Sequence, residues 1–214
     1  MTGFVIRPLQ QTDYQTSYLA MQALTTQRIQ HDQAAVSHTG ELSQDEFWWT
    51  MHPPVYTQGV AGKAEHILSA VKIPVISTNR GGQITYHGPG QLVLYTMVNL
   101  NRLELGTRQF VNLLEQVVID FLNSQALVGH RRHQAPGVYI NEAKIASIGL
   151  RVSKGYSYHG LSLNVAMDLT PFESINPCGY AGLRVTDLQS LGGTSDLPFI
   201  MQTINTLLIK SLYR

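Results

Sequence analysis

The chain contains little cysteine and little charge for its length. Cys178 is the only cysteine among 214 residues, so no intrachain disulfide can form and nothing implies an oxidising compartment. Charged residues make up 14% of the sequence, and the formal net charge is +1. So small a net charge does not create a field that attracts nucleic acid or a membrane surface. We therefore expect neither as a partner.

Long apolar runs are also missing. Hydrophobic residues make up 43% of the chain, but their runs are too short and too interrupted to span a bilayer. The N-terminal stretch MTGFVIRPLQQTDYQ lacks a signal-peptide hydrophobic region of sufficient length and a small-residue cleavage site. The length suits one hydrophobic core, so we expect a single domain over residues 1–214 of a cytoplasmic protein.

Motifs for metal and nucleotide binding are absent as well. The sequence has no HxxxH, HExxH or CxxC pattern, so we expect no metal site and no cofactor. The segment RGGQITYHGPGQ, residues 80–91, matches neither GxxxxGK[ST] nor a GxGxxG motif that opens a helix. We interpret it as a wall along which the glycines let a substrate approach the backbone.

Hydrophobic periodicity predicts an α+β fold. Helical spacing predicts helices over residues 13–31 (with Asp13 as N-cap), 106–125 and 198–213, a short helix over 63–70 and a helical turn within 171–180. Extended segments are predicted twice within 46–59, then over 74–77, 91–100, 137–140, 144–153 and 156–168, with a hairpin at Gly155. Strict alternation of strands and helices is missing. The order therefore indicates a single domain with a mixed, mostly antiparallel sheet flanked by helices.

Cys178 lies in the loop-like segment NPCGY, where proline and glycine flank it. A lone cysteine is commonly a small buried hydrophobe, but a cysteine on a loop is also where reactive thiols occur. An ordinary thiol, with a pKa of about 8.5, is mostly protonated at neutral pH and needs a partner to act as a nucleophile. That partner is a histidine or a lysine, and the residues alone leave the choice open.

Lys144 stands out because it opens the apolar segment KIASIGL. A cation about 4 Å from a thiolate is worth about 4 kcal/mol at an effective dielectric near 20, although burial of both groups reduces this effect. The alternative is a strand-end lysine that extends its ammonium to solvent.

The histidines do not form a ligand pattern. His87 and His159 each lie in a Tyr-His-Gly triplet, which favours hydrogen-bonding walls or structural anchors over metal ligands. Arg131, Arg132 and His133 form a basic cluster that predicts a solvated loop or a contact for an acidic partner.

Three segments carry a resemblance to a known family. RGGQITYHGPGQLVLY, GVYINEAKIASIGLRVSKGYSYHGLSLNV and FESINPCGYAGLRVTDL closely resemble the octanoyltransferase family of lipoic acid biosynthesis, from about residue 53 to residue 188. Ser147 and Ser162 are mild departures, because the family more often carries alanine-rich forms of these segments. The fold implied by the resemblance is that of the catalytic domain of biotin and lipoate protein ligases.

The resemblance implies an enzyme that takes an octanoyl group from octanoyl-acyl carrier protein. It implies a thioester on Cys178, with Lys144 as the residue that activates the thiol and moves protons. The acceptors would be lysines of lipoyl domains, in 2-oxoacid dehydrogenase complexes and in the glycine cleavage H protein. The resemblance implies substrate-binding walls formed by Arg80, Gly81, Gly82, Gln83, Ile84, Thr85, Tyr86, His87, Ser147, Ile148, Gly149, Gly160, Leu161 and Ser162. We add His159, which directly precedes the last of these segments.

Two other functions compete with this one. An ATP-dependent lipoate or biotin ligase on the same fold would form an acyl adenylate and would not need Cys178. A module that only binds acyl carrier protein, without catalysis, would also not need it.

Overall fold

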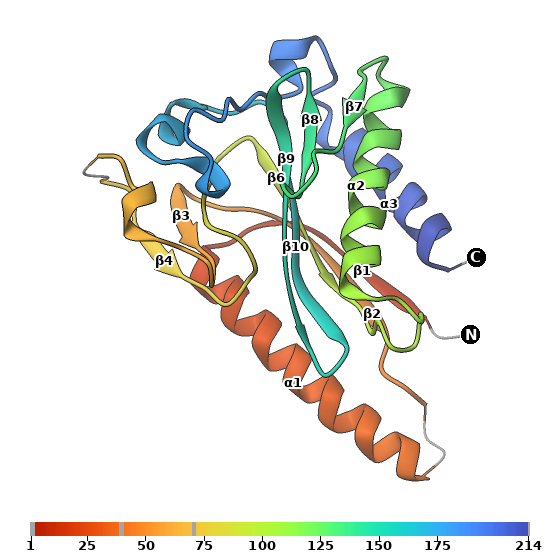
Figure 1. Cartoon of the computed structure of the whole chain (residues 1–214). Coiled ribbons are helices and arrows are strands. Elements are labelled where there is room, and N and C mark those ends of the chain that lie inside the picture. Colours follow the sequence, from red (N-terminus) through yellow and green to blue (C-terminus); the bar gives the residue numbers. More distant parts are fainter. Residues whose placement is uncertain (1–2, 39–40, 70–71, 214) are drawn as a thin grey trace.

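The computed structural model describes residues 3–38, 41–69 and 72–213. Its architecture is the predicted α+β fold, in which two sheets are flanked by three α-helices (Figure 1). The larger sheet has seven strands in the order β1-β2-β6-β10-β9-β8-β7. Only the pairing of β1 with β2 is parallel, so this sheet is mixed and mostly antiparallel, as predicted.

The strands of the large sheet differ in burial. β6 and β10 in its centre are buried at every residue. This fits the apolar run LVLY of β6, whereas β10 also buries polar side chains such as His159 and Asn164. Lys154 and Gly155, both at positive φ, form the predicted hairpin turn between β9 and β10. The strands are β1 (Phe4–Gln11), β2 (Asp45–Met51), β6 (Gln91–Met97), β7 (Gly129–His130), β8 (Val138–Ile140), β9 (Ala143–Ser153) and β10 (Tyr156–Asn164).

The smaller sheet has three strands in the order β4-β3-β5. They are β3 (Val55–Gln58), β4 (Val75–Ser77) and β5 (Ile84–His87). β5 is the middle of the glycine-rich segment, so the smaller sheet holds that segment in place.

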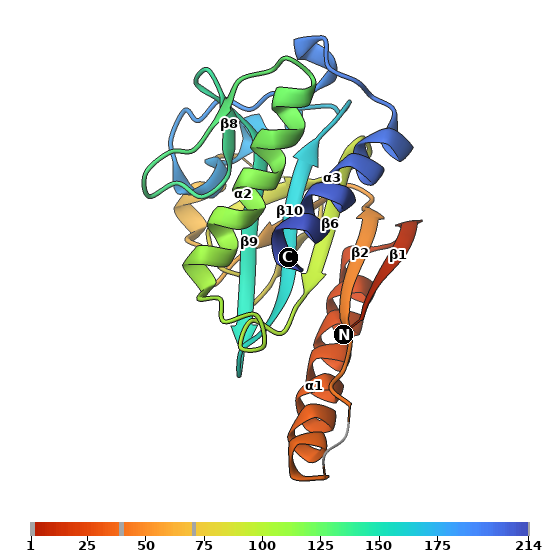
Figure 2. The ribbon, with the colours of Figure 1, turned by 90° about the vertical axis from the view of Figure 1, so that its right-hand side faces the viewer.

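The helices cover both faces of the large sheet. α2 (Thr107–Ser124) and α3 (Leu197–Leu212) cross in front of β9, β10 and β6 in Figure 2, whereas α1 (Tyr14–His38) lies on the opposite face. The apolar stripe of α2 buries Phe110, Leu114 and Phe121 in the main core, together with leucines of β6 and β10. On the other face, Met21 of α1 packs against Tyr95 of β6.

Several local predictions were wrong. α1 continues to His38, seven residues beyond its predicted end. The helix predicted over 63–70 is only a 3₁₀ turn, Ala64–His66, and its last position, residue 70, lies outside the described residues. β1 was not predicted, because seven of its eight residues are exposed and it lacks an alternating pattern. The helical turn predicted within 171–180, by contrast, is confirmed: it consists of two 3₁₀ turns, Thr170–Ser174 and Pro177–Gly179.

Candidate active site

A narrow cavity of about 60 Å³ lies between the large sheet, the glycine-rich segment and the loop that carries Cys178. It brings together most of the residues proposed for substrate binding, although they come from distant parts of the sequence. Its lining residues are Tyr14, Arg80, Gly81, Gly82, Gln83, Thr85, His87, Val93, Tyr95, Ser147, Ile148, Gly149, His159, Gly160, Leu161, Ser162 and Cys178.

Strand register explains the floor of this cavity. Gly160 of β10 pairs with Gly149 of β9 on one side and with Tyr95 of β6 on the other. Directly paired residues of antiparallel strands share a face of the sheet, so these positions lie in one row across the floor. Two of the three carry no side chain, and a Cβ at Gly160 would come within 1.9 Å of the Leu94 carbonyl oxygen. The two glycines therefore leave the space above the sheet unfilled at these positions and allow the strands to lie close together.

Cys178 lies in the 3₁₀ turn Pro177–Gly179, with a backbone φ of 56°. This left-handed conformation costs a residue with a side chain about 1–2 kcal/mol. Neighbouring segments hold the turn, because the backbone N–H of Asn176 donates to the His66 carbonyl at 2.8 Å and the Tyr180 hydroxyl donates to the Gln134 carbonyl. Strained residues of this kind cluster at functional sites.

Lys144 is attached to the same loop through its own backbone. Its N–H donates to the Arg184 carbonyl at 2.9 Å, and its carbonyl accepts from the Thr186 N–H at 3.0 Å. The chain after Cys178 thus pairs with the start of β9 in a short parallel bridge. This pairing brings together two residues that are 34 positions apart in the sequence.

The two side chains meet at 3.0 Å, measured from the Lys144 Nζ to the Cys178 Sγ. The lysine is buried, with 2% of its surface exposed. Burial lowers the pKa of Lys144, but the adjacent Cys178 sulfur and the Tyr139 hydroxyl raise it, and the pKa ends above its ordinary value. The ammonium therefore persists at neutral pH next to the Cys178 sulfur.

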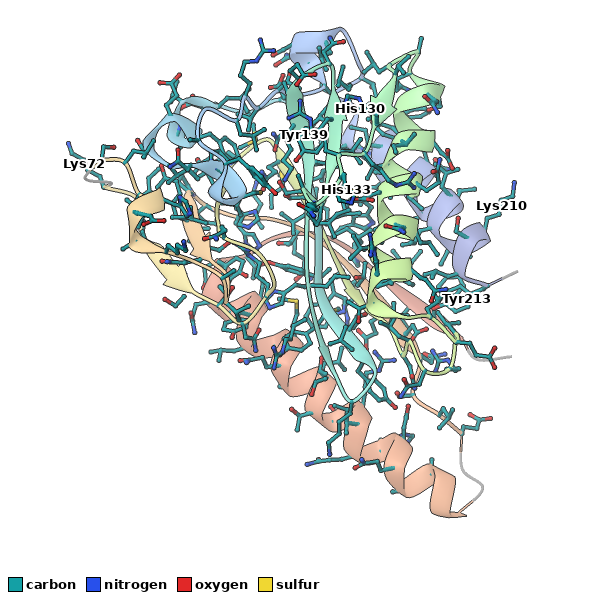
Figure 3. All side chains as sticks on the ribbon, in the orientation of Figure 1. Lys72, His130, His133, Tyr139, Lys210 and Tyr213 are labelled. Atoms are coloured by element: carbon teal, nitrogen blue, oxygen red, sulfur yellow. The ribbon has the colours of Figure 1, made fainter. Side chains whose placement is uncertain are left out.

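Gly137 and Tyr139 shape the space around the lysine. The Lys144 Nζ lies 5.3 Å from the centre of the Tyr139 ring, which stands on β8 beside α2 (Figure 3). Gly137 has a φ of 130°, and a Cβ there would lie 2.7 Å from the Lys144 Cε and 2.5 Å from the Ala146 carbonyl oxygen. Any side chain at this position must displace the lysine.

We expect Gly137→Ala to lower kcat by at least about tenfold, because the added methyl group moves the Lys144 ammonium off the Cys178 sulfur. Overpacking of this kind costs about 1–3 kcal/mol of stability. Gly182→Ala is the matched control: Gly182 also has a positive φ, 68°, but a Cβ there meets nothing within 4 Å. The control should lose stability and keep its turnover. Equal kcat values in both variants would show that the lysine's position is not critical.

Arg80 holds the glycine-rich wall together through hydrogen bonds of its guanidinium group. Its guanidinium is buried and donates to the Thr57 hydroxyl, the Thr57 carbonyl, and the carbonyls of Gly81 and Gln83. The Gly81 N–H in turn donates to the Leu150 carbonyl of β9 at 2.8 Å, which fixes the wall against the floor. The buried Gln83 side-chain oxygen has no partner among the described residues and remains available to a donor on a substrate.

Both predicted histidines lie in the cavity wall and stay neutral. Burial, with a smaller contribution from His52, lowers the pKa of His87 to about 3. Burial, with a smaller contribution from Arg80, lowers the pKa of His159 to about 3. His87 Nδ1 donates to the Gln91 side-chain oxygen at 2.6 Å, since that oxygen can only accept. These histidines act as hydrogen-bonded walls, as the sequence predicted.

Other predicted residues lie elsewhere. Ile84 and Tyr86 alternate with Thr85 and His87 along β5 and pack into a separate cluster with Phe172, away from the cavity. Three further lining residues were not predicted as site residues, namely Tyr14, Val93 and Tyr95, because their sequence pattern is that of an ordinary core.

The predicted basic cluster already has acidic partners nearby. Arg131 pairs with Glu115 at 3.0 Å, and Arg132 pairs with Glu142. His133, labelled in Figure 3, lies in the same loop. The two arginine charges are therefore partly compensated within the chain.

Across residues 3–38, 41–69 and 72–213, no three His, Cys, Asp or Glu side chains are grouped in a way that could hold a metal ion. The helices of this same part of the chain are each too short or too polar to cross a membrane.

Comparison with known proteins identifies the family. Residues 20–211 match the family model described as lipoyl protein ligase A/B catalytic domain. An octanoyltransferase of Chromobacterium violaceum is 51% identical over 188 residues, which cover 88% of this chain and 86% of the relative. An octanoyltransferase of Pseudomonas entomophila is 48% identical and is matched over 99% of this chain and 94% of the relative. The chain belongs to the octanoyltransferase family.

Comparison with solved structures shows that this octanoyltransferase family member has the expected fold. A lipoate-protein ligase A bound with ATP superimposes with a TM-score of 0.76 at 13% identity, covering 100% of this chain and 86% of the ligase. A biotin protein ligase from Aquifex aeolicus gives a TM-score of 0.56 at 10% identity, covering 99% of this chain and 71% of the ligase. At these identities the likeness concerns the fold alone.

Proposed function

We propose that this protein transfers an octanoyl group from octanoyl-acyl carrier protein to a lysine of a lipoyl domain, through a thioester on Cys178. The observation that carries the proposal is the 3.0 Å contact between Cys178 and a buried lysine, beside a narrow cavity, in a member of the octanoyltransferase family. The acceptors that we propose are the lipoyl domains of 2-oxoacid dehydrogenase complexes and the glycine cleavage H protein.

In the first half-reaction, the Cys178 thiolate attacks the thioester carbonyl of the donor. A new carbon–sulfur bond forms, the bond to the carrier's sulfur breaks, and Lys144 gives its proton to the departing thiolate. The exchange of one thioester for another is nearly isoenergetic. It needs a nucleophile and a nearby acid, which the Lys144–Cys178 pair supplies.

In the second half-reaction, the acceptor lysine attacks the acyl-enzyme as a neutral amine. An amide bond forms, the carbon–sulfur bond to Cys178 breaks, and the now neutral Lys144 takes a proton from the attacking nitrogen. Cys178 is released as the thiolate beside a charged Lys144, which is the starting state. Because thioester-to-amide transfer is downhill, no step uses ATP.

ATP independence separates this proposal from a ligase on the same fold, such as the structural neighbour bound with ATP. With octanoyl-acyl carrier protein and a lipoyl domain, we expect octanoylation of the domain at the same rate with and without ATP and Mg²⁺. Intact-mass measurement of the lipoyl domain provides the readout, and free octanoate replaces the carrier-bound donor in the control. Transfer that requires ATP, or that proceeds from free octanoate with ATP, would favour the ligase.

A further inference from the structure

A second, larger cavity of about 480 Å³ lies between α1 and strands β1 and β2 and is open to solvent, since half of its lining residues are exposed. Its lining includes Thr16 and Ala20 of α1 and Trp48 of β2, and more apolar than polar surface faces it. Of the described residues, only Tyr95 lines both cavities. The ring of Tyr95 thus stands where the two spaces meet.

Tyr95 is at the far end of the first cavity from Cys178. The contact between Lys144 and Cys178 marks one end of β9, and Gly149 lies five residues further along that strand, about 16 Å at the usual rise. Gly149 pairs with Gly160, which pairs with Tyr95. An acyl chain attached to Cys178 that runs along this floor therefore ends against Tyr95.

Hydrogen bonds hold the Tyr95 ring in place. His52 Nδ1 lies 2.6 Å from the Thr12 carbonyl oxygen, which can only accept, so this nitrogen carries the proton. Burial lowers the pKa of His52, so the ring is neutral and its Nε2 is an acceptor. The Tyr95 hydroxyl lies 2.6 Å from that Nε2 and donates to it. Tyr95 is 3% exposed and has little freedom to swing aside.

We propose that Tyr95 is a specificity-determining residue whose ring closes the inner end of the acyl cavity and limits the length of the chain that is transferred. This inference rests on the proposed function, because it assumes an acyl chain on Cys178. Removal of the ring joins the first cavity to the second, which has room and apolar surface for additional methylene groups.

The test compares octanoyl-acyl carrier protein with dodecanoyl-acyl carrier protein as donors. We expect Tyr95→Ala to raise the ratio of kcat/KM for dodecanoyl over octanoyl by about 100-fold, because several methylene groups gain a site and each contributes severalfold or more. Valine has a higher strand propensity than alanine, so Tyr95→Val is the less disruptive variant. It should also raise the ratio of dodecanoyl over octanoyl kcat/KM. Tyr95→Phe keeps the ring and loses only its hydroxyl, so its ratio should stay near that of the parent.

Intact-mass measurement of the enzyme separates the possible outcomes. An octanoyl adduct on the parent shows that acyl transfer to the enzyme occurs, whatever Tyr95 does. If the parent forms this adduct but folded Tyr95→Ala and Tyr95→Val keep the parent's chain-length ratio, Tyr95 does not set the length and the inference is overturned. If the parent forms no adduct with either donor, the proposed function itself fails.

Discussion

We expect Lys144→Met to lower the turnover number by about three orders of magnitude and to leave the fold intact. The ammonium lies 3.0 Å from the Cys178 sulfur, and a cation within about 4 Å of a thiolate stabilises it by about 4 kcal/mol or more at an effective dielectric near 20. Methionine preserves the length and the packing of the side chain but carries no charge and no proton to transfer. Both half-reactions therefore lose their acid or base.

Two measurements distinguish this effect from a loss of structure. The midpoint of thermal unfolding should move by only a few degrees, because removal of a buried charge also removes the cost of burying it. The rate of alkylation of Cys178 by iodoacetamide at pH 7 should fall in parallel with turnover. Lys154→Met, which changes an exposed lysine in the hairpin after the same strand, is the matched control and should match the parent in both. Parental turnover in Lys144→Met would overturn the role given to this lysine.

We expect Cys178→Ser to lower the rate of octanoyl transfer by at least about 10⁴-fold, a loss typical of a removed nucleophile. Serine has nearly the same size, but its hydroxyl is far less acidic than a thiol and does not form the anion beside Lys144. A protein that only binds the carrier would tolerate this change. Calorimetric titration with acyl carrier protein that carries no octanoyl group, and so cannot acylate the parent, should therefore give a similar Kd for parent and variant, while turnover with the octanoyl donor is lost. Full turnover in Cys178→Ser would support the binding module instead.

Sequence analysis predicted the helices and strands whose buried faces require a regular pattern of apolar residues. The apolar stripe of α2 and the continuous apolar run of β6 correspond to surfaces that pack on the main core. β1 escaped prediction because it lies at the edge of the sheet and faces solvent, so no burial shapes its sequence. The short helix expected over residues 63–70 failed since the segment from His66 to Leu68 pairs with the chain before Cys178.

The candidate site was predictable in its residues and not in its geometry. Cys178 and Lys144 were selected because a loop cysteine and a lysine on an apolar strand are unusual, and because both match the family's pattern. Their proximity depends on hydrogen bonds between Lys144 and the backbone of residues 184 and 186, which no local pattern encodes. Tyr95 was interpreted as a core residue for a related reason: a buried residue that lines a cavity has the same sequence pattern as one that fills a core.

The central claim is that an octanoyl group resides on Cys178 during transfer. The most direct test mixes the protein with octanoyl-acyl carrier protein, without ATP and without an acceptor, and locates the added mass by peptide mapping. We predict one octanoyl group per chain, on the peptide that contains Cys178, which disappears when a lipoyl domain is added and reappears as an amide on that domain. Transfer to the lipoyl domain without any octanoyl group on Cys178 would contradict covalent catalysis by this residue.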